Sequence, residues 1–588
     1  MSRLTRREFM GTTAAGLVGA DVVAADGPLG SQAPPAGRDG SVTVGGYLAT
    51  RLEQAGVRHY FVVPGDFNLV LLDQLLTNPR LKMIGCCNEL NAGYAADGYA
   101  RVRGVGALST TYGPGELGAI SAVGGGYAEN VPVFHLTGMP TRAAQHKRQL
   151  VHHTLGNGEF DFFAKMAGPV VCAKAIITPQ NAVYETERLI AQAFYHRRPV
   201  YLAIPADVAD QEVLGSAQPL DPPRSNPDNL KAATEAMLSA LESADTACIL
   251  PGMVVKRVGL QPQLQAFVDA SGMPFATMFA DKSVLEEQQP SFIGMYDGRL
   301  MNPDVRGYVE SCDQVVTVVT LMTDFNTGAF TARLDSMKTM AIKHHYTRVG
   351  QWEFHDVEMG DVLSSLTSQV KRRDKDTSLE PASLGPVTTG NGDDAITAEA
   401  LYPRWAEFLR PDDIVIAETG TSSMGLAFAQ MPKGATFHNQ ALWGAIGWAT
   451  PAAFGAAVAA PERRVVLFTG EGSHQITAQE ISQIGRRGLK PTVFVLNNSG
   501  YLSERLMCKD PNIAYNDLAA WRYSELPHAL GCDGWFTTRV TACSELDQAL
   551  QQAAQNGSAS YIEVVTDEYA APPLPQKMHE SRDTLYAR

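Results

Sequence analysis

The sequence predicts an α/β protein made of three doubly wound domains, each a parallel β-sheet covered by helices on both faces. Apolar runs of strand length alternate with helical patterns along most of the 588 residues, which is typical of parallel sheets. Two stretches rich in Pro, Ser, Gly and charged residues, 211–227 and 371–396, interrupt this alternation and indicate linkers. Residues 464–501 form one βαβ pattern, whose two strands are expected to lie parallel and close together.

These breaks divide the chain into a first domain at residues 42–210, a central domain at 228–370 and a third domain at 397–570, followed by a C-terminal tail at 571–588. The predicted strands lie at 59–63, 81–87, 107–111, 131–137 and 199–204 in the first domain, at 247–250, 274–278, 314–319 and 339–342 in the central domain, and at 465–468 and 492–496 in the βαβ unit. The central domain carries no motif with evident chemistry, so we expect it to be scaffold.

Residues 1–25 are predicted to be an export signal, with a Gly/Pro-rich spacer at 26–41. The stretch from Thr5 to Met10, TRREFM, resembles a twin-arginine motif, and a short apolar run then leads to a plausible cleavage site at Val23-Ala24-Ala25. A signal of this kind directs export, so we expect a periplasmic or secreted protein. Twin-arginine export carries folded proteins, which would suit an enzyme that binds its cofactor before export. The alternative is a cytoplasmic protein with a solvated basic N-terminus.

The totals exclude several classes of protein. A net charge of -14 argues against nucleic acid as a partner. Beyond the leader, no apolar run is long enough for a membrane span. The eight cysteines include an adjacent pair, Cys86-Cys87, but they show no C-x-x-C spacing. We therefore expect buried thiols rather than a disulfide framework.

Glycines, a carboxylate and an amide mark the two strand ends of the βαβ unit. Its first strand runs into Gly470-Glu471-Gly472, and its second ends in Asn497-Asn498. Because the carboxyl ends of parallel strands open into one crevice, Glu471 and Asn498 are expected to face each other there. Such oxygen ligands suit Mg²⁺ or Ca²⁺ with phosphate better than zinc. The intervening helix is predicted to begin at a capping box made by Thr477 and Glu480.

The first domain supplies two acids and a pair of histidines. Asp66 follows a strand and a Pro-Gly turn, and Glu89 opens a helical pattern rich in small residues. Taken alone, both positions are typical of acids that stabilise helix starts. His152 and His153, in QLVHHTLG, are taken alone as loop histidines, since adjacent side chains point apart too readily to chelate one metal by themselves.

The motifs acquire a functional meaning in combination. The chain contains, in this order, PGDFNLVLLDQLL, CCNELNAGYAADGYARVRG, GGGYAENVP, LVHHTLG, ALWGAIGWATPAAFGAA, GEGSHQITAQE and NNSGYLSER. Together they resemble the thiamine diphosphate-dependent 2-oxo acid decarboxylases, the pyruvate and indolepyruvate decarboxylases, over residues 42–570. The resemblance implies that the first domain binds the pyrimidine ring of thiamine diphosphate and the third binds its diphosphate with Mg²⁺. It also implies non-oxidative conversion of a 2-oxo acid to an aldehyde and CO2.

The resemblance also assigns roles to individual residues. Glu89 would bind the aminopyrimidine ring and promote removal of the thiazolium C2 proton. Ile446 would bend the cofactor, and protonation and aldehyde release would fall to Asp66, His152, His153 and Glu504. The implied cofactor-binding residues are Glu89, Gly470, Gly472, Ser473, Ile446, Thr419 and Asn498, and the implied metal ligands are Glu471, Asn498 and the carbonyl of Gly500.

The chain departs from the family pattern at two places. Glu471 stands where the family has aspartate, and its additional methylene moves the carboxylate outward by about 1 to 1.5 Å, which puts metal affinity in question. Ser422-Ser423 replaces a large aromatic, and Asn302 stands near the position of another, which favours longer or aromatic substrates over pyruvate. GPGELG at 113–118 matches a dinucleotide-binding fingerprint, but no acid ends the next strand. The stretch therefore does not predict binding of a nicotinamide cofactor.

The family forms its active site between the first domain of one subunit and the third domain of another, so a homodimer or homotetramer is expected. Two alternatives to a decarboxylase remain. One is an acetolactate synthase-like carboligase, which His152-His153 and Asp66 disfavour. The other is a non-catalytic binding protein in which Glu471 has impaired the metal site.

Overall fold

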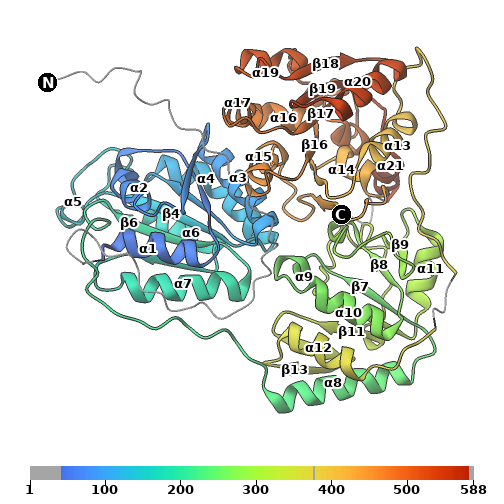
Figure 1. Ribbon diagram of the computed structural model, residues 1–588, viewed down its shortest axis with the longest axis horizontal. Helices are drawn as coiled ribbons and strands as arrows, with labels where there is room; N and C mark the ends of the chain where they lie inside the picture. Colours follow the sequence, from blue (N-terminus) through green and yellow to red (C-terminus); the bar gives the residue numbers. More distant parts are fainter. Residues whose placement is uncertain (1–41, 375–377, 582–588) are drawn as a thin grey trace.

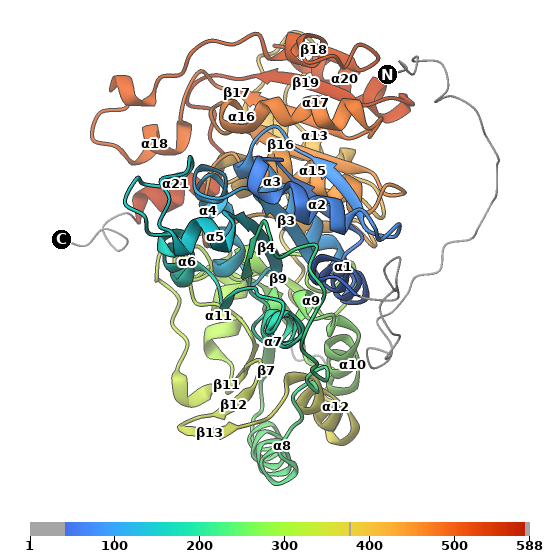
Figure 2. The same cartoon turned by 90° about the vertical axis from the view of Figure 1, so that its left-hand side faces the viewer.

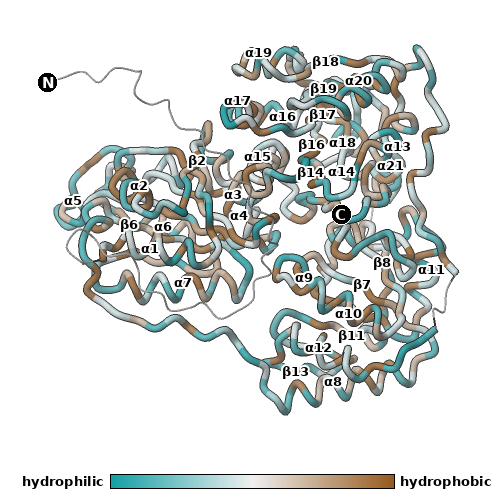
Figure 3. Tube along the Cα trace, viewed as in Figure 1, coloured by the Kyte–Doolittle hydropathy of each residue, from teal (hydrophilic) through white to brown (hydrophobic). Residues whose placement is uncertain are grey.

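The structure is a computed structural model that describes residues 42–374 and 378–581. The predicted export signal and spacer lie outside the described residues. The chain folds into three α/β bodies, each built on its own sheet, with the first body beside the junction of the other two (Figures 1 and 2). A hydrophilic segment connects the first body to the central one (Figure 3). The predicted fold class is thus confirmed.

The first body is a six-stranded parallel sheet in the order β2-β1-β3-β4-β6-β5. Its strands are β1 His59–Val62, β2 Lys82–Gly85, β3 Gly106–Thr110, β4 Val133–Met139, β5 Ala173–Ile176 and β6 Val200–Pro205. Its helices are α1 Val44–Gln54, η1 Asp66–Asn68, α2 Leu69–Leu75, α3 Glu89–Arg103, α4 Pro114–Ala128, α5 Arg142–His146, α6 Phe162–Ala167, η2 Gly168–Val170 and α7 Ala182–His196. The edge strand β5 was not predicted, because every second residue of Ala173–Ile176 is exposed and no apolar run marks it.

The central body has seven strands in the order β13-β12-β11-β10-β7-β8-β9. They are β7 Ala247–Pro251, β8 Phe275–Thr277, β9 Phe292–Met295, β10 Gln314–Val318, β11 Thr339–Ile342, β12 Tyr346–Val349 and β13 Trp352–His355. The helices are α8 Pro227–Glu242, α9 Val254–Arg257, α10 Gln261–Ser271, η3 Phe279–Asp281, α11 Pro303–Ser311, η4 Ser336–Lys338 and α12 Met359–Gln369. Strands β12 and β13 form an antiparallel hairpin at one edge, so this sheet is mixed rather than wholly parallel.

The third body is a six-stranded parallel sheet in the order β15-β14-β16-β17-β19-β18. Its strands are β14 Ile414–Ala417, β15 Thr436–His438, β16 Val465–Gly470, β17 Thr492–Asn497, β18 Phe536–Val540 and β19 Ser560–Val565. Its helices are α13 Ala398–Phe408, α14 Thr421–Leu426, α15 Ala449–Ala459, α16 Glu471–Thr477, η5 Ala478–Glu480, α17 Ile481–Arg486, α18 Leu502–Met507, η6 Ala514–Asn516, η7 Tyr523–Glu525, α19 Leu526–Ala529, α20 Cys543–Gln555 and α21 Pro573–Glu580.

The first and third bodies share one hydrophobic core, which is centred on the packing of α3 against α15 (Figure 1). The two helices approach closely at glycines. A β-carbon on Gly455 would lie 1.9 Å from the carbonyl oxygen of Ala95, and one on Gly98 would lie 2.2 Å from that of Ala452. Any side chain larger than hydrogen would force the helices apart, so this contact fixes the two bodies relative to each other.

Four sequence-based expectations need correction. Helix α16 begins at Glu471, directly after β16, and Thr477 and Glu480 form no capping box: Thr477 instead donates to the Gly447 carbonyl at 2.8 Å. The predicted C-terminal tail contains α21, which packs against α14 and α18. Four of the eight thiols are buried as predicted, but Cys86, Cys172 and Cys508 are half-buried and Cys87 is exposed. The central sheet is mixed, as described above.

The described helices, in residues 42–374 and 378–581, include none with the length and apolar character that a membrane span requires.

Candidate active site

A cavity of about 400 Å³ opens at the carboxyl ends of strands β14, β16 and β17. This is where parallel sheets bind ligands. Every residue lining the cavity comes from the third body. Glu504 is one of them. The others include all the predicted cofactor-binding and metal-binding residues of that body, which are Thr419, Ile446, Gly470, Glu471, Gly472, Ser473, Asn498 and Gly500.

Oε1 of Glu471, the side-chain amide of Asn498 and the carbonyl oxygen of Gly500 meet at the turn that follows β17. The amide nitrogen of Asn498 donates to Oε1 of Glu471 at 3.1 Å and to the carbonyl oxygen of Gly500 at 2.8 Å. A Mg²⁺ ion would need this amide turned over, with its oxygen toward the ion, and adjacent octahedral ligands at 2.1 Å lie about 3 Å apart. The three groups therefore have the spacing of adjacent Mg²⁺ ligands, and they form the oxygen cluster of the third body.

The additional methylene of Glu471 is accommodated by the turn itself. Oε1 of Glu471 accepts hydrogen bonds from the backbone N–H of Asn498 at 3.0 Å and of Gly500 at 2.9 Å. Burial raises the pKa of Glu471 to about 7, and these hydrogen bonds together with the charge of Arg505 oppose the rise. The Glu471 carboxylate is therefore directed at the turn formed by residues 498–500. The oxygen ligands offered by Glu471, Asn498 and Gly500 fit Mg²⁺ despite the departure from aspartate.

The loop that carries Ile446 is fixed by a buried acid, Glu418, at the end of β14. Its carboxylate accepts hydrogen bonds from the backbone N–H of Thr419 at 3.0 Å and of Ala449 at 3.1 Å. Glu418 is fully buried, and burial raises its pKa to about 7. One carboxyl group thus joins two segments of the cavity wall. The sequence contains no signal for this role beyond an acid at a strand end.

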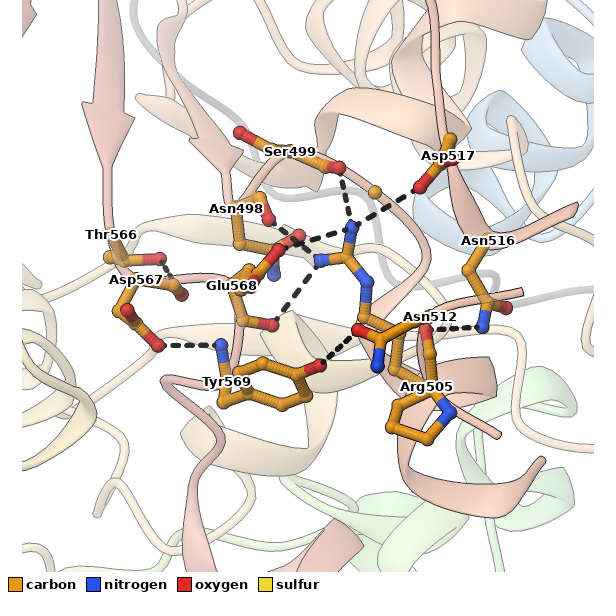
Figure 4. Close-up of polar contacts among 12 residues, drawn as sticks. Asn498, Ser499, Arg505, Asn512, Asn516, Asp517, Thr566, Asp567, Glu568 and Tyr569 are labelled. Atoms are coloured by element: carbon orange, nitrogen blue, oxygen red, sulfur yellow. Dashed lines mark hydrogen bonds and ion pairs between the residues drawn. The ribbon is translucent and has the colours of Figure 1, made fainter. Parts of the chain in front are cut away.

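Arg505 binds the turn that follows β17, with its guanidinium directed at Asn498, Ser499 and Glu568 (Figure 4). Its side chain is only 4% exposed. The guanidinium donates to the carbonyls of Asn498 at 3.0 Å and of Ser499 at 2.7 Å, and it lies 3.8 Å from the carboxylate of Glu568. Because these carbonyls are bonded to Arg505, the neighbouring carbonyl of Gly500 is the one left for a metal. Sequence reasoning missed Arg505, since an arginine after a helical glutamate usually indicates a solvated side chain.

Substituting Arg505→Met is expected to weaken Mg²⁺ binding by about 10- to 100-fold, as for other residues that orient metal ligands. The two carbonyls would lose their donor in a buried place, so the free energy of unfolding should also fall, by about 1–3 kcal/mol. Metal titration and thermal unfolding measure the two effects. Arg522→Met is the matched control, because the Arg522 side chain is 82% exposed. Equal metal affinity in both variants would contradict the supporting role of Arg505.

Glu89 occupies the first turn of α3, in the first body. Asn88 caps this helix by accepting from the backbone N–H of Asn91 at 2.8 Å. Helix α4 packs closely on the carboxylate at Gly118, where a β-carbon would lie 3.3 Å from Oε2 of Glu89. A β-carbon on Gly115 would instead lie 2.8 Å from Cγ2 of Thr111, and one on Gly113 would lie 2.2 Å from the carbonyl oxygen of His153. The glycines of GPGELG are therefore explained by close packing within the first body rather than by dinucleotide binding.

The first body carries a cluster of three polar side chains. The loop that contains His152 and His153 lies beside Asp66, which follows β1. Nε2 of His152 is 2.6 Å from Oδ2 of Asp66, and the His152 and His153 rings are 4.7 Å apart at their centroids. Asp66 and His152 are exposed. Within the single chain, these three residues and Glu89 do not line the cavity. The predicted site residues thus form two separate groups, one on the first body and one on the third.

Comparison with known proteins identifies the family. Three family models match: the thiamine pyrophosphate enzyme N-terminal TPP binding domain at residues 42–162, the central domain at 234–366 and the C-terminal TPP binding domain at 418–564. A protein named alpha-keto-acid decarboxylase from Mycolicibacterium paratuberculosis is 39% identical over 539 residues, which are 90% of this chain and 95% of that protein. The chain belongs to the thiamine diphosphate-dependent 2-oxo acid decarboxylases.

Two further relatives carry the same name. The alpha-keto-acid decarboxylase of Mycobacterium ulcerans is 38% identical, covering 92% of this chain and 96% of that protein. That of Mycobacterium leprae is 36% identical, covering 90% of this chain and 94% of that protein. The family and the carboxy-lyase class predicted from the motifs are therefore confirmed, and so is thiamine diphosphate as the cofactor. The Mg²⁺ ion and the roles of individual residues stay predictions.

Proposed function

We propose that this decarboxylase converts a larger or aromatic 2-oxo acid to an aldehyde and CO2, with Mg²⁺ as its metal and a second copy of the chain completing each active site. The observation that carries the proposal is the meeting of Glu471, Asn498 and Gly500, all with oxygen ligands to offer, in the lining of the cavity. When bound, thiamine diphosphate supplies an electron-withdrawing thiazolium that takes up the electrons released with CO2.

The residues of the third body bind and orient the cofactor. The backbone of Gly470, Gly472 and Ser473, where β16 runs into α16, can approach the diphosphate closely. Ile446 lines the cavity and would contact the middle of the bound cofactor, holding it in position. Glu504, at the start of α18, stands at the cavity wall, where a proton must be delivered during aldehyde formation.

The residues of the first body handle protons on the other side of the reacting centre. Glu89 would bind the pyrimidine ring and would exchange a proton with its nitrogen. The hydrogen-bonded pair of Asp66 and His152, with His153 beside it, passes protons to and from the substrate. Each positioned acid or base of this kind is typically worth about 10²- to 10⁴-fold in rate.

The assembly follows from the separation of the two groups. Exposed apolar side chains occur near both groups in the chain. They are Leu442, Trp443 and Ile476 on the third body, and Leu150, Leu155, Phe162 and Met166 on the first. Such concentrations on a soluble protein are typical of an interface. A two-fold dimer that brings the first body of one copy to the cavity of the other would cover both surfaces and unite the two groups.

Substrate size is inferred from the serines at the start of α14. Ser422 lines the cavity, and Ser423 lines a small adjoining void together with Phe279 and Phe325. These two aromatic rings are stacked with centroids 5.4 Å apart. The void beside Ser423 measures only about 10 Å³, so the room for a substituent lies in the main cavity of about 400 Å³ beside Ser422. Small side chains at this wall favour phenylpyruvate or indolepyruvate over pyruvate.

The test is CO2 release from pyruvate, a branched 2-oxo acid, phenylpyruvate and indolepyruvate, each with and without added thiamine diphosphate and Mg²⁺. We expect release that requires both additions, with the highest kcat/KM for an aromatic substrate. A preference for pyruvate would contradict the substrate assignment. If folded, dimeric protein released no CO2 from any of these substrates, the result would contradict the proposed function as a whole.

A further inference from the structure

We propose that Asp66, His152 and His153 form a second metal site, one that binds Zn²⁺ or a similar transition-metal ion and thereby blocks catalysis. The site is separate from the oxygen cluster of the third body. Each of the three residues offers a ligand atom, and these atoms all lie within 4.8 Å of one another. Within residues 42–374 and 378–581, this is the one group of three or more His, Cys, Asp or Glu side chains that meets this criterion.

Zinc binding requires ligand atoms that lie up to 4.8 Å apart to approach one another by up to about 1.4 Å. Tetrahedral Zn²⁺ takes nitrogen and oxygen ligands at about 2.0–2.2 Å, which places neighbouring ligand atoms about 3.4 Å apart. The 2.6 Å hydrogen bond between His152 and Asp66 must therefore open by somewhat less than 1 Å as the ion replaces its proton. Rotation of exposed side chains can supply this movement, since Asp66 and His152 are both exposed.

The two histidine rings are held in position by their surroundings. Phe67, next to Asp66 in the chain, stacks on His152 with centroids 4.9 Å apart and meets the edge of His153 at 5.8 Å. His153 has a left-handed φ of 64°, and a β-carbon on Gly113 would lie 2.2 Å from its carbonyl oxygen. The adjacent histidines therefore converge, contrary to the expectation from sequence that their side chains point apart.

His153 also has a buried nitrogen, Nδ1, that has no hydrogen-bond partner among the described residues 42–374 and 378–581. A buried polar atom without a partner is costly, and an imidazole whose protonation is not fixed by a neighbour can present either nitrogen to an ion. This is a second observation that points to a ligand at this place.

The chemistry of the donors separates the two sites. Two imidazole nitrogens and one carboxylate suit zinc, cobalt and nickel, whereas oxygens alone suit Mg²⁺. Three protein ligands leave one position of a tetrahedral zinc open to water or to the substrate carboxylate. A metal ion on these side chains would also remove them from proton transfer. This consequence rests on the proposed function, whereas zinc binding itself does not.

The test is calorimetric titration of Zn²⁺ into full-length protein freed of metals and thiamine diphosphate, in a Cys87→Ser background because the exposed Cys87 thiol could itself bind zinc. We expect one zinc ion per chain at high affinity. The substitutions Asp66→Asn, His152→Gln and His153→Gln should each weaken binding by at least about tenfold. A second arm measures decarboxylation with excess Mg²⁺, in which Zn²⁺ should inhibit and a chelator followed by Mg²⁺ should restore activity.

His528→Gln is the matched control. Nδ1 of His528 lies 2.6 Å from the carboxylate of Asp533 at the surface, so it offers an equally close pair without a second histidine. Zinc affinity should be unchanged in this variant, and Glu471→Gln should also keep the zinc site. Unchanged zinc affinity in the variants of Asp66, His152 and His153 would overturn the site. Zinc binding without inhibition of an active enzyme would overturn its blocking role, and an inactive enzyme that binds zinc as expected would count against the proposed function alone.

Discussion

Replacing Glu89 by glutamine is expected to lower kcat by about 10²- to 10⁴-fold, the usual contribution of one positioned acid or base. Glutamine has nearly the same shape and can still approach the pyrimidine ring, but it cannot hold and release the proton. The Glu89 carboxylate packs against Gly118 of α4, so the isosteric amide should be accommodated without repacking. Steady-state CO2 release at saturating thiamine diphosphate and Mg²⁺ measures the loss.

The matched control for this substitution is Glu399→Gln. Glu399 also stands in the first turn of a helix, α13, but it is exposed and remote from the cavity. Both variants lose the same favourable interaction with a helix N-terminus, so both should lose about 0.3–1 kcal/mol of stability. Two results would show that the carboxylate of Glu89 takes no part in proton transfer. One is a similar drop in kcat for both variants, and the other is full activity of the Glu89→Gln enzyme.

Glu471→Gln is expected to weaken Mg²⁺ binding by at least about 100-fold, beyond the losses typical of residues that only support a ligand. The change removes the negative charge of the oxygen cluster, and a neutral amide is a poor partner for a hard dication. Decarboxylation at moderate Mg²⁺ should disappear with it. Metal dependence of activity and direct metal titration provide independent measurements.

Glu471→Asp separates charge from length. Aspartate keeps the negative charge but withdraws the carboxylate by about 1.5 Å, away from the N–H groups of Asn498 and Gly500 that now bind it. We expect Mg²⁺ affinity within about tenfold of the natural protein, because the family pattern has aspartate here and the turn can follow a small shift. Mg²⁺-dependent activity that survives in Glu471→Gln would contradict the assignment of Glu471 as a metal ligand.

The sequence was sufficient for those parts of the site that depend on strand ends and glycines. The position of Glu471 and Asn498 follows from the geometry of parallel strands, which brings the ends of β16 and β17 to one edge of the sheet. Family motifs then located Ile446 and Glu504, and both line the same cavity. These inferences succeeded because the relevant contacts are local or follow from one βαβ unit.

The sequence was insufficient where the contacts come from distant segments. Arg505 binds carbonyls of a turn and approaches Glu568 from a different part of the chain, and nothing in YLSER distinguishes it from a solvated arginine. The convergence of His152 and His153 depends on the ring of Phe67, about 85 residues away. The β12–β13 hairpin was missed because its strands are short and β13 is largely exposed. Tertiary packing, rather than local pattern, decides such cases.

The most direct test of the central claim, that each active site needs two copies of the chain, is a mixing experiment with the two inactive variants. Glu89→Gln and Glu471→Gln chains are unfolded, refolded together in equal amounts, and assayed for CO2 release. With random pairing, half of the dimers contain both variants, and each of these has one site with Glu89 and Glu471 intact. The mixture should therefore recover about a quarter of the natural activity. If every site were formed within one chain, the mixture would stay as inactive as its two components, and that result would contradict the account.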